Sequence, residues 1–285
     1  MTALSVPSRD GVYKSVYTPS FLSIVYDYLV LRFNMRYMWG CPTDEVLLPF
    51  FAEGMSRRHL DVGVATGYLP AMALARVFRR TAAQHLTLLD INPHPLAAAA
   101  ARVRAATGPS TEVRTVEADV TAPLPSALQV VRVSSSEEEE EEKENQMQYY
   151  DSISMFNLFH CIPGWPAKLV ALRTYKALLE PDRGVLYGCT VLGERAATGW
   201  LSRWYVRLYN RRGLFNNLHD DREGFEAALN REFAEVETWL VGMTLLFRAA
   251  RPRRDDGEEV AVGKEADSDN GEEEDDDDDD DDDDE

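Results

Sequence analysis

The chain has 285 residues, enough for one large domain or two small ones, and a formal net charge of −19. Two acidic runs carry that charge: residues 255–285 hold about −20 and residues 137–144 about −6, so the remainder is mildly basic at about +7. Like-charge runs of this kind repel themselves and predict disordered segments rather than an acidic folded domain.

Cysteine content and hydropathy exclude several classes of protein. Cys41, Cys161 and Cys189 are too few and too scattered for a disulfide framework or a zinc cluster, so no metal is expected. Residues 1–10 lack a basic region followed by an apolar core, which argues against a secretory signal. The most apolar window, residues 21–39, contains three charged side chains and predicts no membrane span. We therefore expect a cytoplasmic protein without a membrane partner.

The N-terminal region combines a helical pattern with many aromatic side chains. Apolar residues recur at helical spacing over residues 20–35, and Thr43 or Asp44 is placed to cap a second helix over residues 45–53. The aromatic residues of this region are Tyr13, Tyr17, Tyr26, Tyr28, Phe33, Tyr37 and Trp39. Two compatible interpretations follow: the helix packs its aromatic face on the main domain, or it forms a lid over a binding site.

Residues 59–68 read as a buried strand, a turn of small residues and the start of a helix. This order brings bare backbone and helix N–H groups close to a ligand. Gly63 and Gly67 remove the Cβ atoms that would block a close approach. The P-loop pattern is absent, and Gly63, Ala65 and Gly67 do not form the dinucleotide fingerprint G-x-G-x-x-G.

Predicted strands and helices then alternate along the chain. Strands are expected at residues 86–90, 112–117, 150–156 and 185–192, with helices at residues 96–106 and 168–179. Such alternation predicts a parallel sheet covered by helices on both faces. After a helix at residues 225–229, strands at residues 236–240 and 243–249 are joined so briefly that they must be antiparallel.

Acidic residues recur at the ends of the first three predicted strands. Asp61, Asp90 and Asp119 are separated by 29 residues each, which is one strand–helix unit. The carboxyl ends of parallel strands form the ligand-binding edge of such a sheet. Asp90 suits a ribose diol, because its two oxygens can accept both hydroxyl hydrogens. For each carboxylate the alternative is a helix cap or a solvated strand end.

A further cluster follows the strand at residues 150–156. Phe156 and Asn157 come at its end, and His160 follows in the sequence His-Cys-Ile-Pro-Gly. A histidine can take a proton from a hydroxyl or ammonium group near neutral pH. The alternative is a buried histidine that hydrogen-bonds to backbone at the strand exit.

Together these motifs resemble class I S-adenosylmethionine-dependent methyltransferases. Asp61, Gly63 and Gly67 match the pattern D-x-G-x-G-x-G, with Ala65 in place of the middle glycine. The resemblance implies a Rossmann-like α/β fold with a seven-stranded, mostly parallel sheet, an antiparallel C-terminal hairpin and an N-terminal helical lid. It implies S-adenosyl-L-methionine as cofactor, with His160 and Asn157 beside the reacting methyl. The implied cofactor-binding residues are Asp61, Gly63, Ala65, Thr66, Gly67, Asp90, Asn92, Asp119, Val120 and Phe156.

A closer resemblance, over residues 13–251, is to fungal and bacterial methyltransferases that modify small molecules in secondary metabolism. It is carried by the motifs Trp39-x-Cys41-Pro42-Thr43, His59-Leu60-Asp61-Val62-Gly63, His160-Cys161-x-Pro163-Gly164 and Tyr209-Asn210-x-x-Gly213-x-Phe215-x-Asn217. It implies methyl transfer to nitrogen or oxygen of a fungal secondary metabolite. The metabolites of this group include peptide-derived mycotoxins. The expected substrate-facing residues are Tyr17, Tyr26, Trp39 and Tyr209.

The predicted organisation is a flexible N-terminus (1–12), a methyltransferase domain (13–251) with a helical lid (13–56) and an acidic insert (134–148), and an acidic tail (252–285). Two rival functions stay open. One is a nucleic-acid or protein methyltransferase, although the Asn-Pro-Pro-Tyr signature of base methylation is missing, which makes nucleic acid an unexpected partner. The other is a non-catalytic binding module. The substrate, the accepting atom (N, O or C) and the oligomeric state are open as well.

Overall fold

The computed structural model describes residues 21–75, 84–107, 111–128 and 149–254. The predicted N-terminal lead, the acidic insert (134–148), residues 255–285 of the acidic tail and Tyr17 therefore lie outside the described residues. Contacts divide the chain into two units, Met1–Arg253 and Arg254–Glu285. The second unit contains one described residue, Arg254, so the fold below is that of the first unit.

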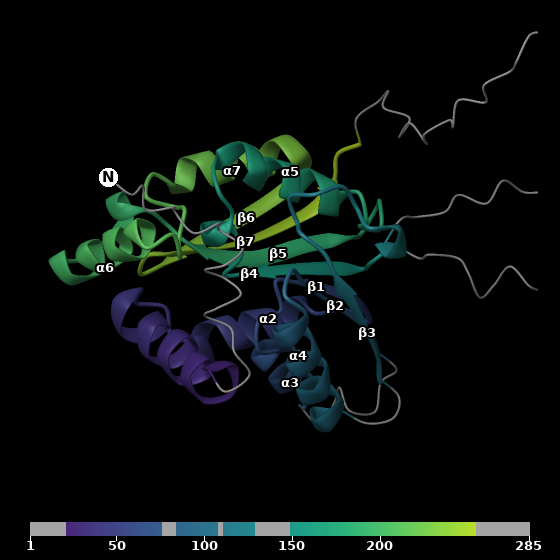
Figure 1. Ribbon diagram of the computed structural model, residues 1–285. Coiled ribbons are helices and arrows are strands. Elements are labelled where there is room, and N and C mark those ends of the chain that lie inside the picture. The colour runs from purple at the N-terminus through teal and green to yellow at the C-terminus, as the bar shows by residue number, and fades with distance from the viewer. Residues whose placement is uncertain (1–20, 76–83, 108–110, 129–148, 255–285) are drawn as a thin grey trace, which may run out of the picture. The chain divides into compact units, whose positions relative to one another are not determined.

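A seven-stranded sheet in the order β3-β2-β1-β4-β5-β7-β6 forms the centre of the first unit (Figure 1). Neighbours from β3 to β5 pair in parallel, whereas β7 is antiparallel to both β5 and β6. The predicted parallel sheet with an antiparallel terminal hairpin is therefore confirmed. The strands are β1 (Arg58–Val62), β2 (Gln84–Asp90), β3 (Thr111–Glu117), β4 (Ser152–Phe156), β5 (Val185–Val191), β6 (Phe233–Val241) and β7 (Thr244–Pro252).

Helices cover both faces of the sheet (Figure 1). The N-terminal helix η1 (Phe21–Met38) has wide π-type turns, and at its end the Trp39 N–H donates to the Asn34 carbonyl, five residues earlier. The others are η2 (Thr43–Leu47), α2 (Leu48–Gly54), α3 (Tyr68–Leu74), α4 (Pro93–Ala106), α5 (Trp165–Lys176), α6 (Trp200–Arg211) and α7 (Arg222–Glu232), with short turns η3 (Ser126–Leu128), η5 (Phe159–Cys161) and η6 (Glu194–Ala196). No helix among the described segments is long and apolar enough to cross a membrane.

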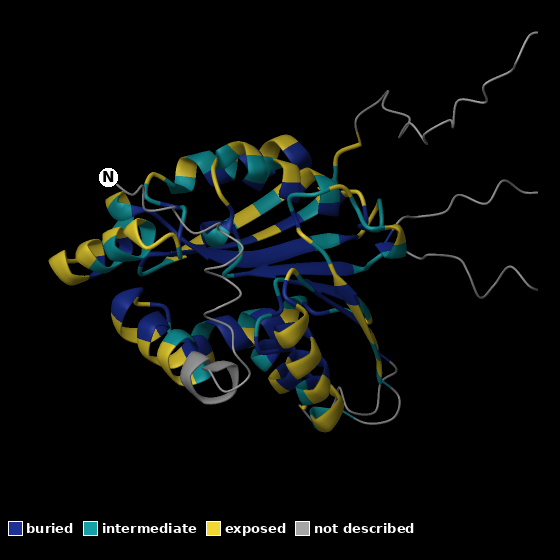
Figure 2. Ribbon diagram, viewed as in Figure 1, coloured by how far each residue is buried: buried dark blue, intermediate teal, exposed yellow. Residues whose placement is uncertain are grey.

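The core divides into two apolar layers, one on each face of the sheet, and the central strands between them are buried (Figure 2). One layer joins η1, η2, α2, α3 and α4 to side chains such as Phe156 and Tyr187. The other joins α5 and α7 to Leu60, Ile153 and Phe247. Side chains of a strand point alternately to the two faces, so neighbouring residues of β1 and β4 enter different layers.

Two details differ from the sequence prediction. Helix η2 begins at Thr43 after Pro42, and neither Thr43 nor Asp44 caps it; that prediction was wrong. The Thr43 hydroxyl donates instead to the Leu31 carbonyl of η1, and Asp44 accepts a hydrogen bond from Tyr68. Both polar side chains thus form hydrogen bonds with residues distant in sequence, whereas the local pattern predicted that one of them caps the helix. In addition, β7 extends to Pro252, one residue beyond the end predicted for the domain.

Candidate active site

Residues 63–67, here called the glycine turn, connect β1 to α3 at the carboxyl edge of the sheet. Gly63, Ala65 and Gly67 all have positive φ, at 77°, 49° and 67°. A Cβ at Gly67 would lie 2.8 Å from the Ala99 Cα of α4, and one at Gly63 would lie 3.0 Å from Leu158 Cδ1. The glycines thus let the turn lie against α4 and the segment after β4. Ala65 adopts the left-handed conformation that glycine takes more cheaply.

Asp90, at the end of β2, is linked to the glycine turn by its carboxylate. One oxygen accepts from the Ala65 N–H at 3.2 Å and the other from the Asn92 N–H at 3.0 Å. Burial raises the pKa of Asp90 to about 6. Each oxygen keeps a further lone pair, so the group can still accept from two vicinal hydroxyls. Nearby, the buried Nδ2 of Asn92 has no hydrogen-bond partner among the described residues.

Asp61, the last residue but one of β1, lies on the face that α2 and α3 cover, with 4% of its surface exposed. The Ser154 hydroxyl of β4 donates to its Oδ1 at 2.6 Å. The pKa of Asp61 is raised to about 7, chiefly by burial and also by the charge of Asp90, while the Ser154 hydrogen bond opposes the rise. A buried carboxylate of this kind favours a positively charged ligand, because ionisation is otherwise costly there.

The third predicted carboxylate has different surroundings. Asp119 is exposed after β3, and its Oδ1 accepts from the Thr121 N–H at 2.8 Å and the Thr121 hydroxyl at 2.7 Å. Val120 beside it is buried. The exposure of Asp119 agrees with the alternative of a solvated strand end, and the arrangement places an apolar side chain and an acidic one at the same edge as Asp90.

Thr66 ties the glycine turn to the N-terminal helix. Its hydroxyl donates to Asp27 Oδ1 of η1 at 2.6 Å, and Arg102 of α4 pairs with Asp27 Oδ2 at 2.6 Å. The guanidinium of Arg102 also lies over the Tyr68 ring, 5.1 Å from its centroid. Helix η1 is therefore attached to the turn and to α4, as a lid over this edge requires.

Phe156 ends β4 and Asn157 follows it at the same edge. Phe156 is buried in a cluster of aromatic rings, with centroid distances of 5.1 Å to Phe51 and 5.6 Å to Tyr187. Asn157 has a φ of 55°, and its Oδ1 accepts from the Cys189 thiol at 3.5 Å. The left-handed conformation of Asn157 turns the chain away from the sheet and towards His160.

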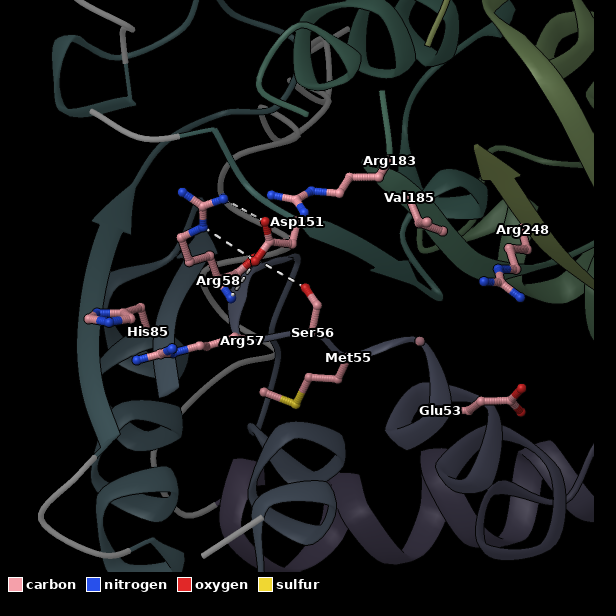
Figure 3. A pocket seen from close by; sticks show the side chains of 11 residues that line it. Glu53, Met55, Ser56, Arg57, Arg58, His85, Asp151, Arg183, Val185 and Arg248 are labelled. Carbon is pink, nitrogen blue, oxygen red and sulfur yellow. Dashed lines mark hydrogen bonds and ion pairs between the residues drawn. The ribbon is translucent and has the colours of Figure 1, made fainter. Parts of the chain in front are cut away.

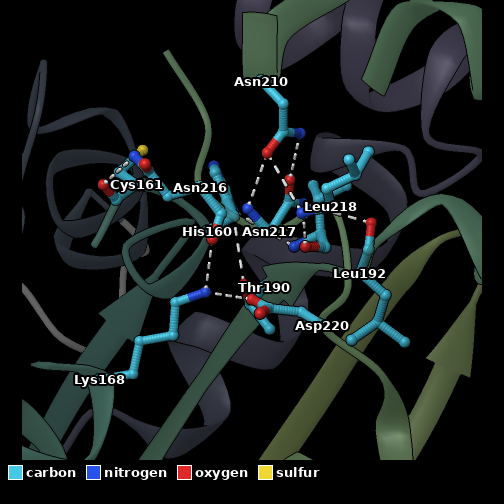
Figure 4. A network of polar contacts seen from close by, with 11 residues as sticks. His160, Cys161, Lys168, Thr190, Leu192, Asn210, Asn216, Asn217, Leu218 and Asp220 are labelled. Atoms are coloured by element: carbon cyan, nitrogen blue, oxygen red, sulfur yellow. Dashed lines mark hydrogen bonds and ion pairs between the residues drawn. The ribbon is translucent and has the colours of Figure 1, made fainter. Parts of the chain in front are cut away.

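His160 is buried, and its surroundings are those of a structural histidine (Figure 4). Its Nδ1 accepts from the Val191 N–H at 3.3 Å, and its ring centroid lies 4.2 Å from that of Phe215. Burial lowers the pKa of His160 to about 3, and the nearby positive charge of Lys168 contributes. A histidine with so low a pKa is a weak base at neutral pH.

A buried ion pair lies beside His160 and was not predicted. The Lys168 ammonium of α5 donates to Asp220 and, at 3.0 Å, to the carbonyl oxygen of Asn216 (Figure 4). Asn217, fully buried, donates to the carbonyls of Val191 at 2.7 Å and Leu192 at 3.2 Å. These contacts fix the segment after α6 against the end of β5. The motif from Tyr209 to Asn217 singled out Asn217 in the sequence, but it did not indicate that Asn217 binds the carbonyls at the end of β5.

Aromatic side chains of the lid and of α6 meet at this edge. Trp39 is buried, with ring centroids 5.8 Å from Tyr205, 6.1 Å from Tyr209 and 5.7 Å from Phe215. The Tyr209 hydroxyl accepts from Asn34 Nδ2 of η1 at 3.0 Å. Trp39 and Tyr209 are therefore in ring contact, and their predicted role in facing the substrate stays a prediction. Tyr26 belongs to η1, but the position of its side chain is not among those described.

A hollow of about 730 Å³ lies at the opposite, amino edge of the sheet (Figure 3). Its lining includes Arg57, Arg58, His85, Asp151 and Val185, at or beside the first residues of β1, β2, β4 and β5. The Arg58 guanidinium pairs with Asp151 at 2.6 Å. Because ligands of such sheets bind at the carboxyl ends of the strands, size alone does not make this hollow the active site.

The sequence matches the Methyltransferase domain family over residues 37–229. It is 64% identical over 256 residues to the O-methyltransferase NEC2 of Pyricularia oryzae, covering 87% of this chain and 96% of that protein. It is 36% identical over 234 residues to the methyltransferase verB of Penicillium polonicum, covering 80% and 93%. The fold is similar to that of an O-methyltransferase family protein from Burkholderia thailandensis, with a TM-score of 0.51 at 14% identity, covering 75% of this chain and 57% of that one.

The chain belongs to the class I S-adenosylmethionine-dependent methyltransferases. The predictions of the family, the fold class, an enzyme and its cofactor are confirmed. The residues present fit that cofactor. Asp90 keeps free lone pairs beside the glycine turn, and the buried amide of Asn92 has an unused donor among the described residues. The fungal O-methyltransferase relatives agree with the predicted role in small-molecule metabolism.

Proposed function

We propose that this enzyme methylates a hydroxyl oxygen of a small aromatic metabolite, and that the accepting hydroxyl is a phenol or an enol. The observation that carries the choice of oxygen is the 64% identity to an O-methyltransferase over 87% of the chain. The same proposal includes the finer prediction of a mycotoxin-type product.

The aromatic cluster supports a flat, unsaturated acceptor. Trp39, Tyr205, Tyr209 and Phe215 lie where the lid, α6 and the end of β5 meet. Tyr205 and Tyr209 are partly exposed, with ring centroids 4.9 Å apart. Aromatic faces of this kind bind a planar ring by stacking and by exclusion of water.

The low basicity of His160 supports an acceptor molecule whose hydroxyl group is acidic. The pKa of His160 is lowered to about 3 by burial, and its Nδ1 accepts from backbone. A phenol or an enol loses its proton far more readily than an aliphatic alcohol, so it needs no strong base in the site. His160 then positions the segment around the acceptor, while its predicted role as the base stays a prediction.

The cofactor, when bound, supplies an electrophilic methyl group. Asp61 and the glycine turn would hold its methionine part, Asp90 and Asn92 its ribose, and Asp119 with Val120 its adenine. The chain's contribution is to position the acceptor in line with the methyl and to exclude water, since positioning supplies much of the catalysis of such a transfer. Phe156 and Asn157 lie at the carboxyl end of β4, where this position is expected.

The remaining predictions are part of the same proposal. We place the enzyme in the cytoplasm, and the domain predicted to begin at residue 13 runs to the end of β7 at Pro252, so the predicted acidic tail begins at residue 253. The oligomeric state stays open.

The experiment that tests the proposal uses the full chain, S-adenosylmethionine and matched acceptors that differ only in the attacking group. Naphthols, an enolic 4-hydroxycoumarin, an arylmethanol and an arylamine form the set, and product is identified by mass spectrometry with NMR. The proposal expects methyl ethers from the naphthol or the enol and none from the arylmethanol. Predominant N-methylation, or methyl transfer to RNA in place of all small acceptors, would contradict it.

A further inference from the structure

A row of polar side chains crosses the buried interior between β1 and β4. His59 and Asp61 of β1 lie directly opposite Ser152 and Ser154 of β4 in the strand register. All four side chains are buried, with at most 4% of their surface exposed, and they share the sheet face that α2 covers. Polar groups in such a place destabilise the fold unless each is hydrogen-bonded.

The contacts form a continuous chain that ends on Asp61. Ser56 Oγ lies 2.5 Å from Ser152 Oγ, which lies 2.7 Å from His59 Nδ1. His59 Nε2 lies 3.0 Å from Ser154 Oγ, which donates to Asp61 Oδ1 at 2.6 Å. Ser56 lines the hollow at the amino edge (Figure 3), so this row of hydrogen bonds runs from the amino edge of the sheet towards the carboxyl edge.

The direction of each hydrogen bond follows from the last one. Ser154 has a single hydroxyl hydrogen, which it donates to Asp61, so its contact with His59 requires the Nε2–H tautomer. His59 Nδ1 then accepts from the Ser152 hydroxyl, and Ser152 in turn accepts from the N–H and the hydroxyl of Ser56. One arrangement of hydrogens satisfies the contacts from Ser56 to Asp61, with the Ser56 hydroxyl donating to Ser152 at 2.5 Å in preference to the Arg58 carbonyl at 3.4 Å.

We propose that His59 is a positioning residue, which aims the Ser154 hydroxyl at Asp61 and thereby holds the carboxylate ionised and oriented for the cationic amino group of the cofactor. This inference rests on the proposed placement of the cofactor beside Asp61. Without His59 as a donor, Ser154 can rotate its hydrogen away, and Asp61 then loses the hydrogen bond from the Ser154 hydroxyl.

The row also affects how cofactor affinity depends on pH. The pKa of Asp61 is raised to about 7 by burial; the charge of Asp90 on β2 raises it too, and Ser154 on β4 lowers it. Protonated Asp61 no longer attracts a cationic amino group, so affinity falls as the pH drops through this pKa. Loss of the Ser154 hydrogen bond moves that midpoint to higher pH.

Two amide substitutions separate the two ends of the imidazole. In His59→Gln the amide nitrogen stands near the position of Nε2 and can still donate to Ser154. In His59→Asn the amide stands near Nδ1, keeping the contact with Ser152 and losing the one with Ser154. Titration of S-adenosylhomocysteine into the full-length protein by calorimetry, from pH 5.5 to 8, gives the affinity and the midpoint, with circular dichroism to confirm folding.

We expect His59→Gln to bind within about threefold of the wild-type affinity with an unchanged midpoint, and His59→Asn to bind about tenfold more weakly with a higher midpoint. Ser154→Ala carries the same expectation as His59→Asn and keeps the test available if that variant does not fold. Wild-type affinity and midpoint in both His59→Asn and Ser154→Ala would overturn the proposal. Wild-type affinity in Asp61→Asn would instead overturn the placement of the cofactor itself.

Discussion

Two buried polar networks, one between β1 and β4 and one beside the end of β5, differ in what they join. The row from Ser56 to Asp61 joins side chain to side chain between two paired strands, and it follows their register. The network around Lys168 joins side chains to backbone carbonyls and fixes the segment after α6. The first network therefore sets the state of a carboxylate, whereas the second sets the path of a loop.

The difference shows in the two histidines that belong to these networks. The ring nitrogens of His59 both contact serine hydroxyls, one of which leads to Asp61. The Nδ1 of His160 accepts from a backbone N–H, and the ring packs on Phe215. Both side chains are buried, so burial alone does not distinguish a residue that acts on the site from one that supports it.

The largest effect is expected in the loop network. Lys168→Met leaves the carboxylate of Asp220 buried without its partner, which should lower the free energy of unfolding by about 3–5 kcal/mol. Urea unfolding followed by circular dichroism measures this loss. The double variant Lys168→Met with Asp220→Leu should recover most of it, because no unpaired charge remains. A Lys168→Met variant as stable as the wild type would mean that the pair does not hold the loop.

The glycine turn provides a matched pair of substitutions. Gly67→Ala forces a β-carbon to 2.8 Å from Ala99 at a φ of 67°, which should cost about 2–4 kcal/mol of stability. Gly213 has a similar φ of 70° with no atom within 4 Å of an added Cβ, so Gly213→Ala should cost only about 1 kcal/mol. Thermal or urea unfolding gives both values. Equal losses would show that contact with α4 does not constrain the turn.

The two networks should give stability opposite dependences on pH. The pKa of His160 is lowered to about 3 in the native state. Below pH 6.5 the unfolded chain therefore binds a proton that the native state does not bind, and the free energy of unfolding falls as the pH drops. The pKa of Asp61 is raised to about 7, so between about pH 4 and 7 the native state holds a proton that the unfolded chain releases, and stability falls as pH rises. Each slope approaches about 1.4 kcal/mol per pH unit.

Substitution separates the two slopes. His160→Gln should remove the loss of stability on acidification, and Asp61→Asn should remove the loss between pH 4 and 7. Urea unfolding at half-unit pH intervals measures both. Parallel curves for the two variants and the wild type would contradict these assignments.

The smallest effect concerns the residue that departs from the family pattern. Ala65 has a φ of 49°, and Ala65→Gly should relieve that strain and raise the free energy of unfolding by about 0.5 kcal/mol. Ala98→Gly, at an exposed position within α4, is the control and should lower it by about 1 kcal/mol. Destabilisation by both substitutions would mean that the turn accommodates Ala65 without strain.

Local patterns sufficed to predict the strands and the carboxylates of the site. Each short apolar run that ends in an acidic residue became a parallel strand, and Asp61 and Asp90 came to lie at one edge because such strands share a direction. The lid and the aromatic cluster followed from helical spacing and from the density of aromatic residues.

The polar networks could not be predicted in this way, because each joins residues that are distant in sequence. Ser154 is 93 residues from Asp61, and Asp220 is 52 residues from Lys168. The alternation of serine and apolar residues from Ser152 to Ser154 indicated that one face of β4 is polar. Only the strand register shows that the two serines lie opposite His59 and Asp61. The burial of His160 likewise depends on Phe215, which reaches it from the segment after α6.

The central claim is that the carboxyl ends of β1 and β2 hold S-adenosylmethionine. Calorimetric titration of the cofactor into the full-length wild type, Asp90→Ala and the control Glu117→Ala tests it most directly. Glu117 is exposed and pairs with Asp90 in the register of β2 and β3. The account predicts that Asp90→Ala weakens binding by about 1–3 kcal/mol and that Glu117→Ala leaves it unchanged. Equal affinity in all three proteins would contradict it.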